Sequence, residues 1–291
     1  MDVLNFTFLK ILAPTILALI MVNMGASVRL SHFKDLFVTP KALCLGLTLQ
    51  ILILPLITLL ILTFIPINPM LAVGIMILVA CPGGPGANAL AYVCDGDTAL
   101  SVALSIMCSF AIGISLPIIV KFSMSHFLNS NSYIDISEAF ALSIQVLILM
   151  LIPLSLGMVI KKFMPKVATV LEFYAKPVSM GLLVLLIIIL LMNLQGSLLT
   201  SLFSTAAVVL TLCFSALIIS QLVSSNFELP IKQARSIIIG VSFQNAALAF
   251  TISLHLSDNP MLAVPAALYT PITLPLSILL IYLFKRQSAA C

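Results

Sequence analysis

Long apolar stretches, separated by short polar ones, dominate the whole chain. Nine of them have roughly the length, about 17–25 residues, that an α-helix needs to cross the hydrocarbon core of a bilayer. They cover residues 9–28, 43–64, 70–94, 98–121, 137–160, 177–195, 199–223, 234–257 and 260–284. The stretches lack the alternation that membrane β-strands show. The pattern therefore predicts an all-α, polytopic membrane protein with nine transmembrane helices.

Composition agrees with a lipid bilayer as the main solvent. The 291 residues are 62% hydrophobic and only 8% charged, and the mean hydropathy is +1.27. A soluble domain carries about 25% charged residues, so no soluble core could bury this much apolar surface. We expect no nucleic-acid partner.

The basic residues predict the orientation. With the N-terminus outside, alternation of the spans places 11 of the 13 Lys and Arg residues inside, and only Lys10 and Lys121 outside. The inner set is Arg29, Lys34, Lys41, Lys161, Lys162, Lys166, Lys176, Lys232, Arg235, Lys285 and Arg286. The positive-inside rule demands this asymmetry. We expect an integral protein of the cell (inner) membrane with its C-terminus inside. Residues 163–175 are either a short interfacial helix or a loop.

Two of the spans contain a stretch that should interrupt a helix. Residues 81–87 read CPGGPGA, and residues 240–244 read GVSFQ. Proline removes a backbone donor, and glycine lacks a side chain to restrain the backbone. At membrane depth such irregular backbone survives only where protein or a water-filled cavity satisfies it. We therefore predict two broken helices.

The two broken spans also resemble each other. Asn88 begins NALAY and Asn245 begins NAALAF, and each span is followed by a short acidic turn, at 95–97 and 258–260. The spans are five apart in order, so they run in opposite directions, as in an inverted-topology repeat. Helix N-termini meeting at the midplane would suit an anion, and helix C-termini a small cation.

The quoted residues resemble the signature of the bile acid:sodium symporter family, and the likeness extends over essentially the whole chain. The matching runs are CPGGPGANALAYVCDGDTALSVALS (81–105), GVSFQNAALAF (240–250) and AVPAALY (263–269). The chain resembles a nine-span bacterial-type form that lacks the first of ten spans. The resemblance implies two domains with substrate between them: a panel domain at 1–42 and 134–196, and a core domain at 43–133 and 197–291.

The resemblance implies a secondary transporter of an organic anion, such as a bile acid or a small carboxylate like pantoate, that works by alternating access. The candidate substrate-binding residues are Pro85, Gly86, Asn88, Asn245, Thr270 and Thr273, with Asn23, Asn193 and Gln195 as weaker candidates from the panel side. Other roles stay open for several of them. The asparagines could cap half-helices, and the threonines could pack at a proline kink.

By the same resemblance, one sodium site comprises Asn88, Ser101 and Ser105, and another comprises Gln50, Gln244 and backbone carbonyls near Val241 and Phe243. Alternatively, the two glutamines are interhelical contacts, and the serines bond to carbonyls one turn back. Three positions depart from the family. Ala87 stands for a serine, Pro85 for a threonine, and Gly240 for the glutamate shared by both sites. A cation there would lose its only full countercharge, so we expect sodium coupling to be weakened or lost.

Other classes of protein receive less support. A sodium-independent uniporter or exchanger, or a channel-like permease, is the alternative function. An enzyme is not expected, because Asp95 and Asp97 share one turn and no second buried acid faces them, as an intramembrane aspartyl protease would require. The six cysteines and three histidines form no metal-binding pattern. The sequence leaves the oligomeric state open, with a monomer as one option.

Overall fold

The computed structural model describes residues 3–27, 40–128, 136–171, 173–174, 181, 184–185, 188, 199–257 and 259–290, and these residues are almost entirely helical. The helices are α1 (Val3–Ser27), α3 (Pro40–Thr48), η1 (Leu49–Ile53), α4 (Leu54–Phe64), α5 (Pro69–Ala80), α6 (Pro85–Val93), α7 (Thr98–Leu128), α8 (Ile136–Phe163), α10 (Leu199–Asn226), α11 (Ile231–Ser242), α12 (Ala246–Leu256), η3 (Pro260–Ala263) and α13 (Val264–Ala290). Among the described residues there is no strand beyond one isolated bridge. The all-α prediction is confirmed.

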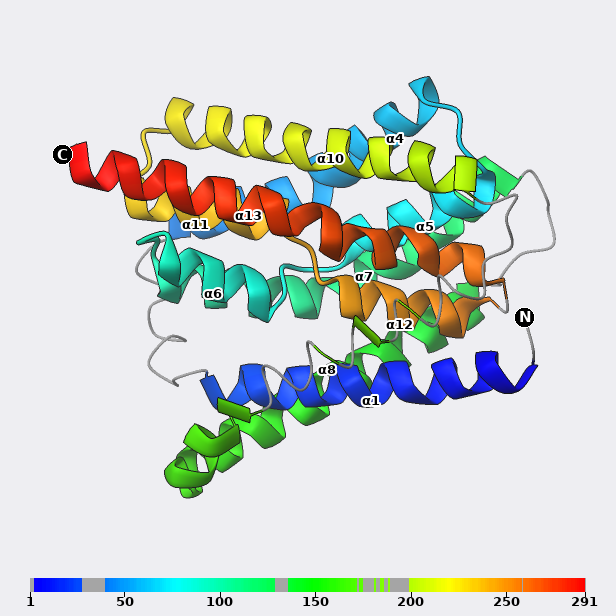
Figure 1. Ribbon diagram of the computed structural model, residues 1–291, viewed down its shortest axis with the longest axis horizontal. Coiled ribbons are helices and arrows are strands. Elements are labelled where there is room, and N and C mark those ends of the chain that lie inside the picture. The colour runs from blue at the N-terminus through cyan, green and yellow to red at the C-terminus, as the bar shows by residue number, and fades with distance from the viewer. Residues whose placement is uncertain are drawn as a thin grey trace.

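The long helices run roughly parallel to the longest axis of the molecule (Figure 1). In the part of the chain that the structure describes, six helical segments are long and apolar enough to cross a membrane. They are Leu9–Ala26, Pro40–Phe64, Thr98–Leu128, Ile144–Phe163, Leu202–Asn226 and Pro260–Ser288. The predicted span 177–195 lies largely outside the described residues. Residues 165–171 are helical. Of the two alternatives for residues 163–175, a helix or a loop, this part is a helix.

The helices divide into a central and a peripheral type. Leu71–Val79 in α5 and Ala246–Leu254 in α12 are buried without interruption, as expected of helices that are apolar on all sides and surrounded by protein. The peripheral α8 instead exposes a large apolar side chain every four residues. These side chains are Phe140, Ile144, Ile148, Ile152 and Leu156. This stripe is typical of a surface that faces lipid.

Helices α1 and α8 pack closely against each other and form the lower edge of the view in Figure 1. Their closest approach is at Gly25 and Gly157. A Cβ atom on Gly25 would collide with the carbonyl oxygen of Leu154, and one on Gly157 with the carbonyl oxygen of Val22. Small residues at helix crossings of membrane proteins permit such backbone contact. The pair meets the remaining helices through α6, α7 and α12.

The two predicted helix breaks are present. The first lies between Ala80 and Pro85, and the second between Ser242 and Ala246. They meet in an antiparallel bridge between Gly83 and Gln244, where the Asn245 N–H donates to the Pro82 carbonyl at 2.9 Å. In Figure 1, α6 and α11 lie toward one end of the long axis and α5 and α12 toward the other, with both connections near mid-length.

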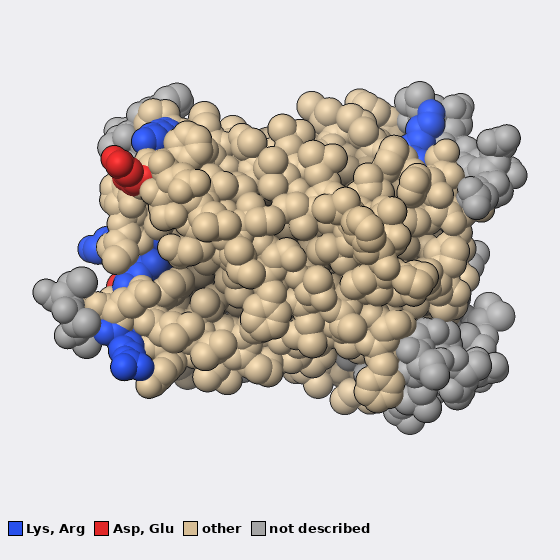
Figure 2. Space-filling view, turned by 90° about the horizontal axis from the view of Figure 1, so that it is seen from above, with Lys and Arg blue, Asp and Glu red and all other residues tan. Residues whose placement is uncertain are grey.

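Charged side chains gather at the two ends of the long axis, and the face between them in Figure 2 shows none. Arg235, near the start of α11, is only 4% exposed. Its guanidinium donates to the carbonyls of Cys94 (3.1 Å) and Phe284 (3.0 Å) and to the Ser288 hydroxyl (2.8 Å). The sequence places Arg235 among the charges at the inner surface. The structure shows that it connects the C-terminal ends of α6 and α13 to α11. A positive charge at a helix C-terminus is stabilising because of the helix dipole.

Candidate functional site

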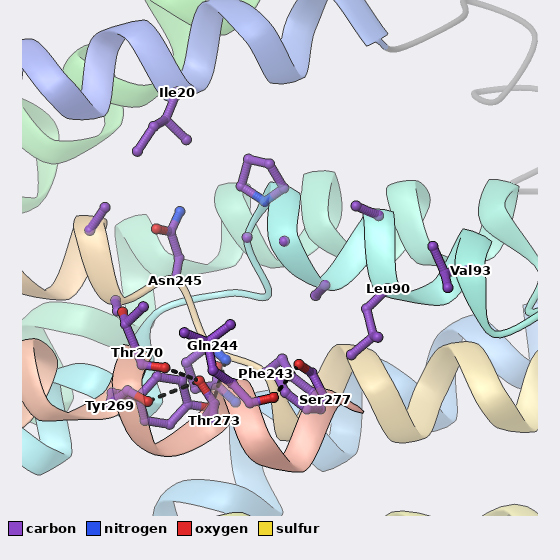
Figure 3. A pocket seen from close by; sticks show the side chains of 18 of the residues that line it. Ile20, Leu90, Val93, Phe243, Gln244, Asn245, Tyr269, Thr270, Thr273 and Ser277 are labelled. Atoms are coloured by element: carbon purple, nitrogen blue, oxygen red, sulfur yellow. Dashed lines mark hydrogen bonds between the residues drawn. The ribbon is translucent and has the colours of Figure 1, made fainter. Parts of the chain in front are cut away.

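A cavity of about 660 Å³ lies beside the two helix breaks, between α1 and the helices α6, α12 and α13. Its lining residues are Ile20, Asn23, Gly84, Pro85, Gly86, Ala87, Ala89, Leu90, Val93, Phe243, Gln244, Asn245, Ala246, Ala247, Tyr269, Thr270, Thr273, Leu274 and Ser277. Figure 3 shows side chains of the second break, of α6 and of α13, with Ile20 of α1 on the opposite side of this space. The described lining contains no charged side chain. It is mainly apolar with a few amides and hydroxyls, which is typical of a small-molecule site.

Two helix N-termini open on this cavity. Helix α6 begins at Pro85 after Gly84, and α12 begins at Ala246 after Asn245; all four residues line the cavity. The helix dipole adds partial positive charge at such an end. Pro85 has no N–H, and the N–H groups of Ala87, Ala246 and Leu248 already have acceptors, so only part of the first-turn donors can serve a solute. Two such ends facing one space can therefore bind an anion without a basic side chain.

Asn245 combines a structural role with a place in the cavity. Its Oδ1 accepts from the N–H of Leu248 at 3.1 Å and so caps α12. Its amide projects toward Ile20 (Figure 3), and the side chain is 6% exposed. Oδ1 carries the cap, which leaves the Nδ2 group able to donate into the cavity.

Helix α13 supplies the hydroxyl groups of the cavity. The Thr273 hydroxyl donates to the carbonyl of Tyr269 at 2.9 Å, and the residue also lines the cavity. Within the described residues, the Thr270 hydroxyl makes no hydrogen bond and can serve a solute. The Tyr269 hydroxyl donates to the Ser242 carbonyl (2.6 Å) and accepts from the Gln244 N–H (2.9 Å), and it thereby satisfies backbone groups of the second break.

Asn88 differs from the other predicted substrate residues, because all of those that the structure describes line the large cavity. It sits one turn inside α6 and is not among the residues that line the large cavity. Its Oδ1 accepts from the hydroxyls of Ser101 (2.8 Å) and Ser105 (3.0 Å) of α7. The three residues that the resemblance assigned to one sodium site are therefore together in space, at the contact between α6 and α7. Asn88 does not cap α6, because the N-cap position is Gly84.

The second predicted group is also together in space. Gln50 and Gln244 form a direct side-chain hydrogen bond of 2.7 Å, and Gln244 Nε2 donates to the Val241 carbonyl at 2.6 Å. Phe243 forms the end of α11 and lines the large cavity. Gly240 lies between the two groups and lines a second cavity of about 10 Å³ with Gln50 and Ser105.

Three features of the site were not predicted. Gln50 lies in a π-helical turn, Leu49–Ile53, and such turns are common at functional sites. Tyr269 was quoted only as part of the resemblance, although its hydroxyl holds the second break. A tyrosine beside paired prolines in the last span was the available signal for it. Pro55, just after the π turn, was a signal of an irregular helix there. The buried position of Arg235 is the third.

Asn23 lines the cavity from α1, while Asn193 and Gln195 lie outside the described residues.

A mainly apolar cavity between two helix breaks, within a bundle of apolar helices, is an arrangement typical of membrane transporters. Comparison with known proteins agrees. The family model for the Sodium Bile acid symporter family matches residues 14–202. The chain belongs to this family, which is a family of transporters.

Relatives of the chain are named as sodium cotransporters or sodium-dependent transporters. The chain is similar to the probable sodium/metabolite cotransporter BASS1, chloroplastic, of Arabidopsis thaliana, with 25% identity over 86% of this chain and 61% of the relative. It is 25% identical to the uncharacterized sodium-dependent transporter YocS of Bacillus subtilis, over 91% of this chain and 80% of the relative. The human ileal sodium/bile acid cotransporter is 30% identical over 54% of this chain and 44% of its own length. The chain thus spans less than two thirds of two of these three relatives.

Proposed function

We propose that the protein is a secondary carrier of an organic anion, bound in the 660 Å³ cavity and moved by alternating access. The observation that carries this proposal is the opening of two helix N-termini, those of α6 and α12, on one mainly apolar space. Backbone dipoles and neutral donors such as Asn245 and Thr270 would hold the anionic group, and the apolar wall would hold the rest. A bile-acid-like molecule or a small carboxylate such as pantoate suits this chemistry.

The proposal includes a topology. The two pairs of half-helices, α5–α6 and α11–α12, would count as one broken span each, and residues 177–195 would supply a further one. With the six long segments, this gives nine spans, arranged as an inverted repeat with the N-terminus outside and the C-terminus inside the cell membrane. Helices α1 and α8 would belong to the panel domain, and the remaining described helices to the core. Their movement against each other would expose the cavity to either side.

The proposal also holds that sodium coupling is weaker than in typical relatives. Relatives are named as sodium-dependent transporters or sodium cotransporters. This chain has Ala87 and Gly240 where the resemblance expects an oxygen ligand and a carboxylate. A channel-like permease is the second candidate, and substrate counterflow separates the two functions.

A pair of asparagine variants tests the proposed binding site. Asn245→Ala should lower uptake of radiolabelled pantoate or taurocholate into proteoliposomes by about tenfold or more, because a hydrogen bond to a charged group contributes about 1.5–3 kcal/mol. Asn68→Ala is the matched control. Asn68 caps α5 through the N–H of Met70 at 2.9 Å, but it is exposed and outside the cavity.

Both variants lose one helix cap, which costs about 1 kcal/mol, and only Asn245→Ala also loses a cavity donor. Uptake that falls equally in the two variants would assign the effect to capping. Unchanged uptake in Asn245→Ala would contradict the proposed site.

A further inference from the structure

The side-chain amide of Gln50 lies where the two helix breaks meet. Gln50 is 5% exposed, and its Nε2 faces three acceptors. These are Gln244 Oε1 at 2.7 Å, the Cys81 carbonyl at 3.0 Å and the Val79 carbonyl at 3.4 Å. Cys81 belongs to the first break and Gln244 to the second. One neutral amide thus joins both breaks from the π turn of η1.

The neighbouring oxygens are also paired with donors of the protein itself. The Val241 carbonyl accepts from Gln244 Nε2, and the Ser242 carbonyl accepts from the Tyr269 hydroxyl. On the other side of Gly240, Asn88 Oδ1 accepts from two serines. The Val241 and Ser242 carbonyls and Asn88 Oδ1 therefore already accept from N–H or O–H donors. Among the described residues, Gln50 Oε1 is buried and accepts no hydrogen bond.

No countercharge accompanies these oxygens in the described residues around them. The small cavity between the two groups is lined by Gly46, Gln50, Gly83, Leu104, Ser105, Cys108, Gly240 and Val241, none of which is acidic. A buried monovalent cation without a negative partner is strongly disfavoured. One unpaired amide oxygen, Gln50 Oε1, without a carboxylate beside it is a poor fit to the ion that the family name implies.

We propose that the Gln50 amide replaces the cation, so that the crossing of the two breaks is assembled without Na⁺. The N–H₂ group presents the positive end of a dipole to acceptors of both breaks, which is the role that a bound cation would have there. The transporter then needs no sodium ion to hold its substrate-binding conformation. This inference deepens the proposed function, since it concerns the ion coupling of the same site.

Thermal unfolding of the detergent-purified full chain tests the inference without any substrate. NaCl and choline chloride at equal ionic strength should give the same Tm for the unmodified protein, within about 1 °C, because an ion that does not bind the folded state cannot stabilise it. Stabilisation by several degrees that is specific for Na⁺ would overturn the inference.

Two variants of Gln50 separate the roles of its amide. Gln50→Leu removes the donor and leaves buried acceptors unpaired, so Tm should fall by several degrees, equally in both salts. Gln50→Glu places a carboxylate against the Cys81 carbonyl and Gln244 Oε1 at a pH where it is ionised. Its Tm should fall in choline chloride and recover in NaCl. Lack of recovery, or a Tm of Gln50→Leu equal to that of the unmodified protein, would contradict the role given to Gln50.

The two proposals fail in different ways. Absence of carrier-type transport for every organic anion tried would overturn the proposed function and leave the Tm results unaffected. Sodium-specific stabilisation of an active carrier would overturn only the role of Gln50.

Discussion

Single residues decide which solutes this protein can hold. Tyr269, Gln50 and Gln244 satisfy buried polar groups of the two breaks. This leaves the cavity with few free polar groups, such as the Asn245 amide and the Thr270 hydroxyl. Under the proposed function, an uncharged donor set of this kind would recognise an anion through dipoles and hydrogen bonds, without the cost of a buried basic side chain.

Gly240 is the residue whose replacement should change ion dependence most. A Cβ atom there would meet only Leu104 Cδ1, at 3.9 Å, and the small cavity lies beside it. Gly240→Glu should bring a countercharge to the oxygens of Asn88 and Gln244, so that NaCl raises Tm by several degrees over choline chloride. Gly240→Gln, of equal size but neutral, should show no such difference.

A sodium response in both variants, or in neither, would show that a carboxylate at Gly240 does not reach the oxygens of the two groups. The comparison between the variants controls for any loss of stability caused by the larger side chain.

At the scale of elements, the sequence predicts where the two helices break, but not the residue at which each second half-helix begins. Pro82, Gly83 and Gly84 cannot continue a regular transmembrane helix, so the first break is readable from residue type. The match of NALAY with NAALAF pairs Asn88 with Asn245, whereas by helix position Asn245 corresponds to Gly84. A short sequence match does not show where each helix begins, because the helix starts depend on how the two breaks meet at Gly83 and Gln244.

Other element-level features depend on tertiary packing and so were not predictable. The π turn at Leu49–Ile53 lies in an apolar run between Gly46 and Pro55. These two residues indicate a disturbed helix but do not specify a π turn. Burial of Arg235 needs the ends of α6 and α13, which lie far from it in sequence. The co-location of Gln50 and Gln244 was available only through the family resemblance, because their separation in the chain gives no local signal.

Glycine substitutions test the contact between α1 and α8. Gly157→Ala should lower Tm by several degrees, because its Cβ would collide with the Val22 carbonyl oxygen and overpacking costs about 1–3 kcal/mol. Gly240→Ala is the matched control, since it has the same helical context and room for the new atom. It should keep or raise Tm, as alanine favours helices over glycine by about 1 kcal/mol.

Equal Tm values for Gly157→Ala and Gly240→Ala would contradict the close backbone contact between α1 and α8. Differential scanning fluorimetry in a single detergent is sufficient for this comparison.

At the scale of the whole molecule, the cavity is bounded by two groups of helices. Ile20 and Asn23 come from α1, which packs on α8, while the other lining residues come from α6, α12, α13 and the two breaks. A binding site shared in this way opens or closes when one group moves against the other. The sequence predicts the apolar spans and the charged ends that fix such a molecule in a bilayer, and Figure 2 shows those ends.

Counterflow tests the central claim, that one cavity is exposed alternately to the two sides of the membrane. Proteoliposomes containing the full chain would be loaded with excess unlabelled anion, identified beforehand as a ligand by thermal shift, and diluted into trace labelled anion. Our account predicts transient accumulation of label above its equilibrium level, abolished by Asn245→Ala and retained by Asn68→Ala. Entry of label that approaches equilibrium without overshoot, at a rate independent of the internal anion, would contradict it and indicate a channel.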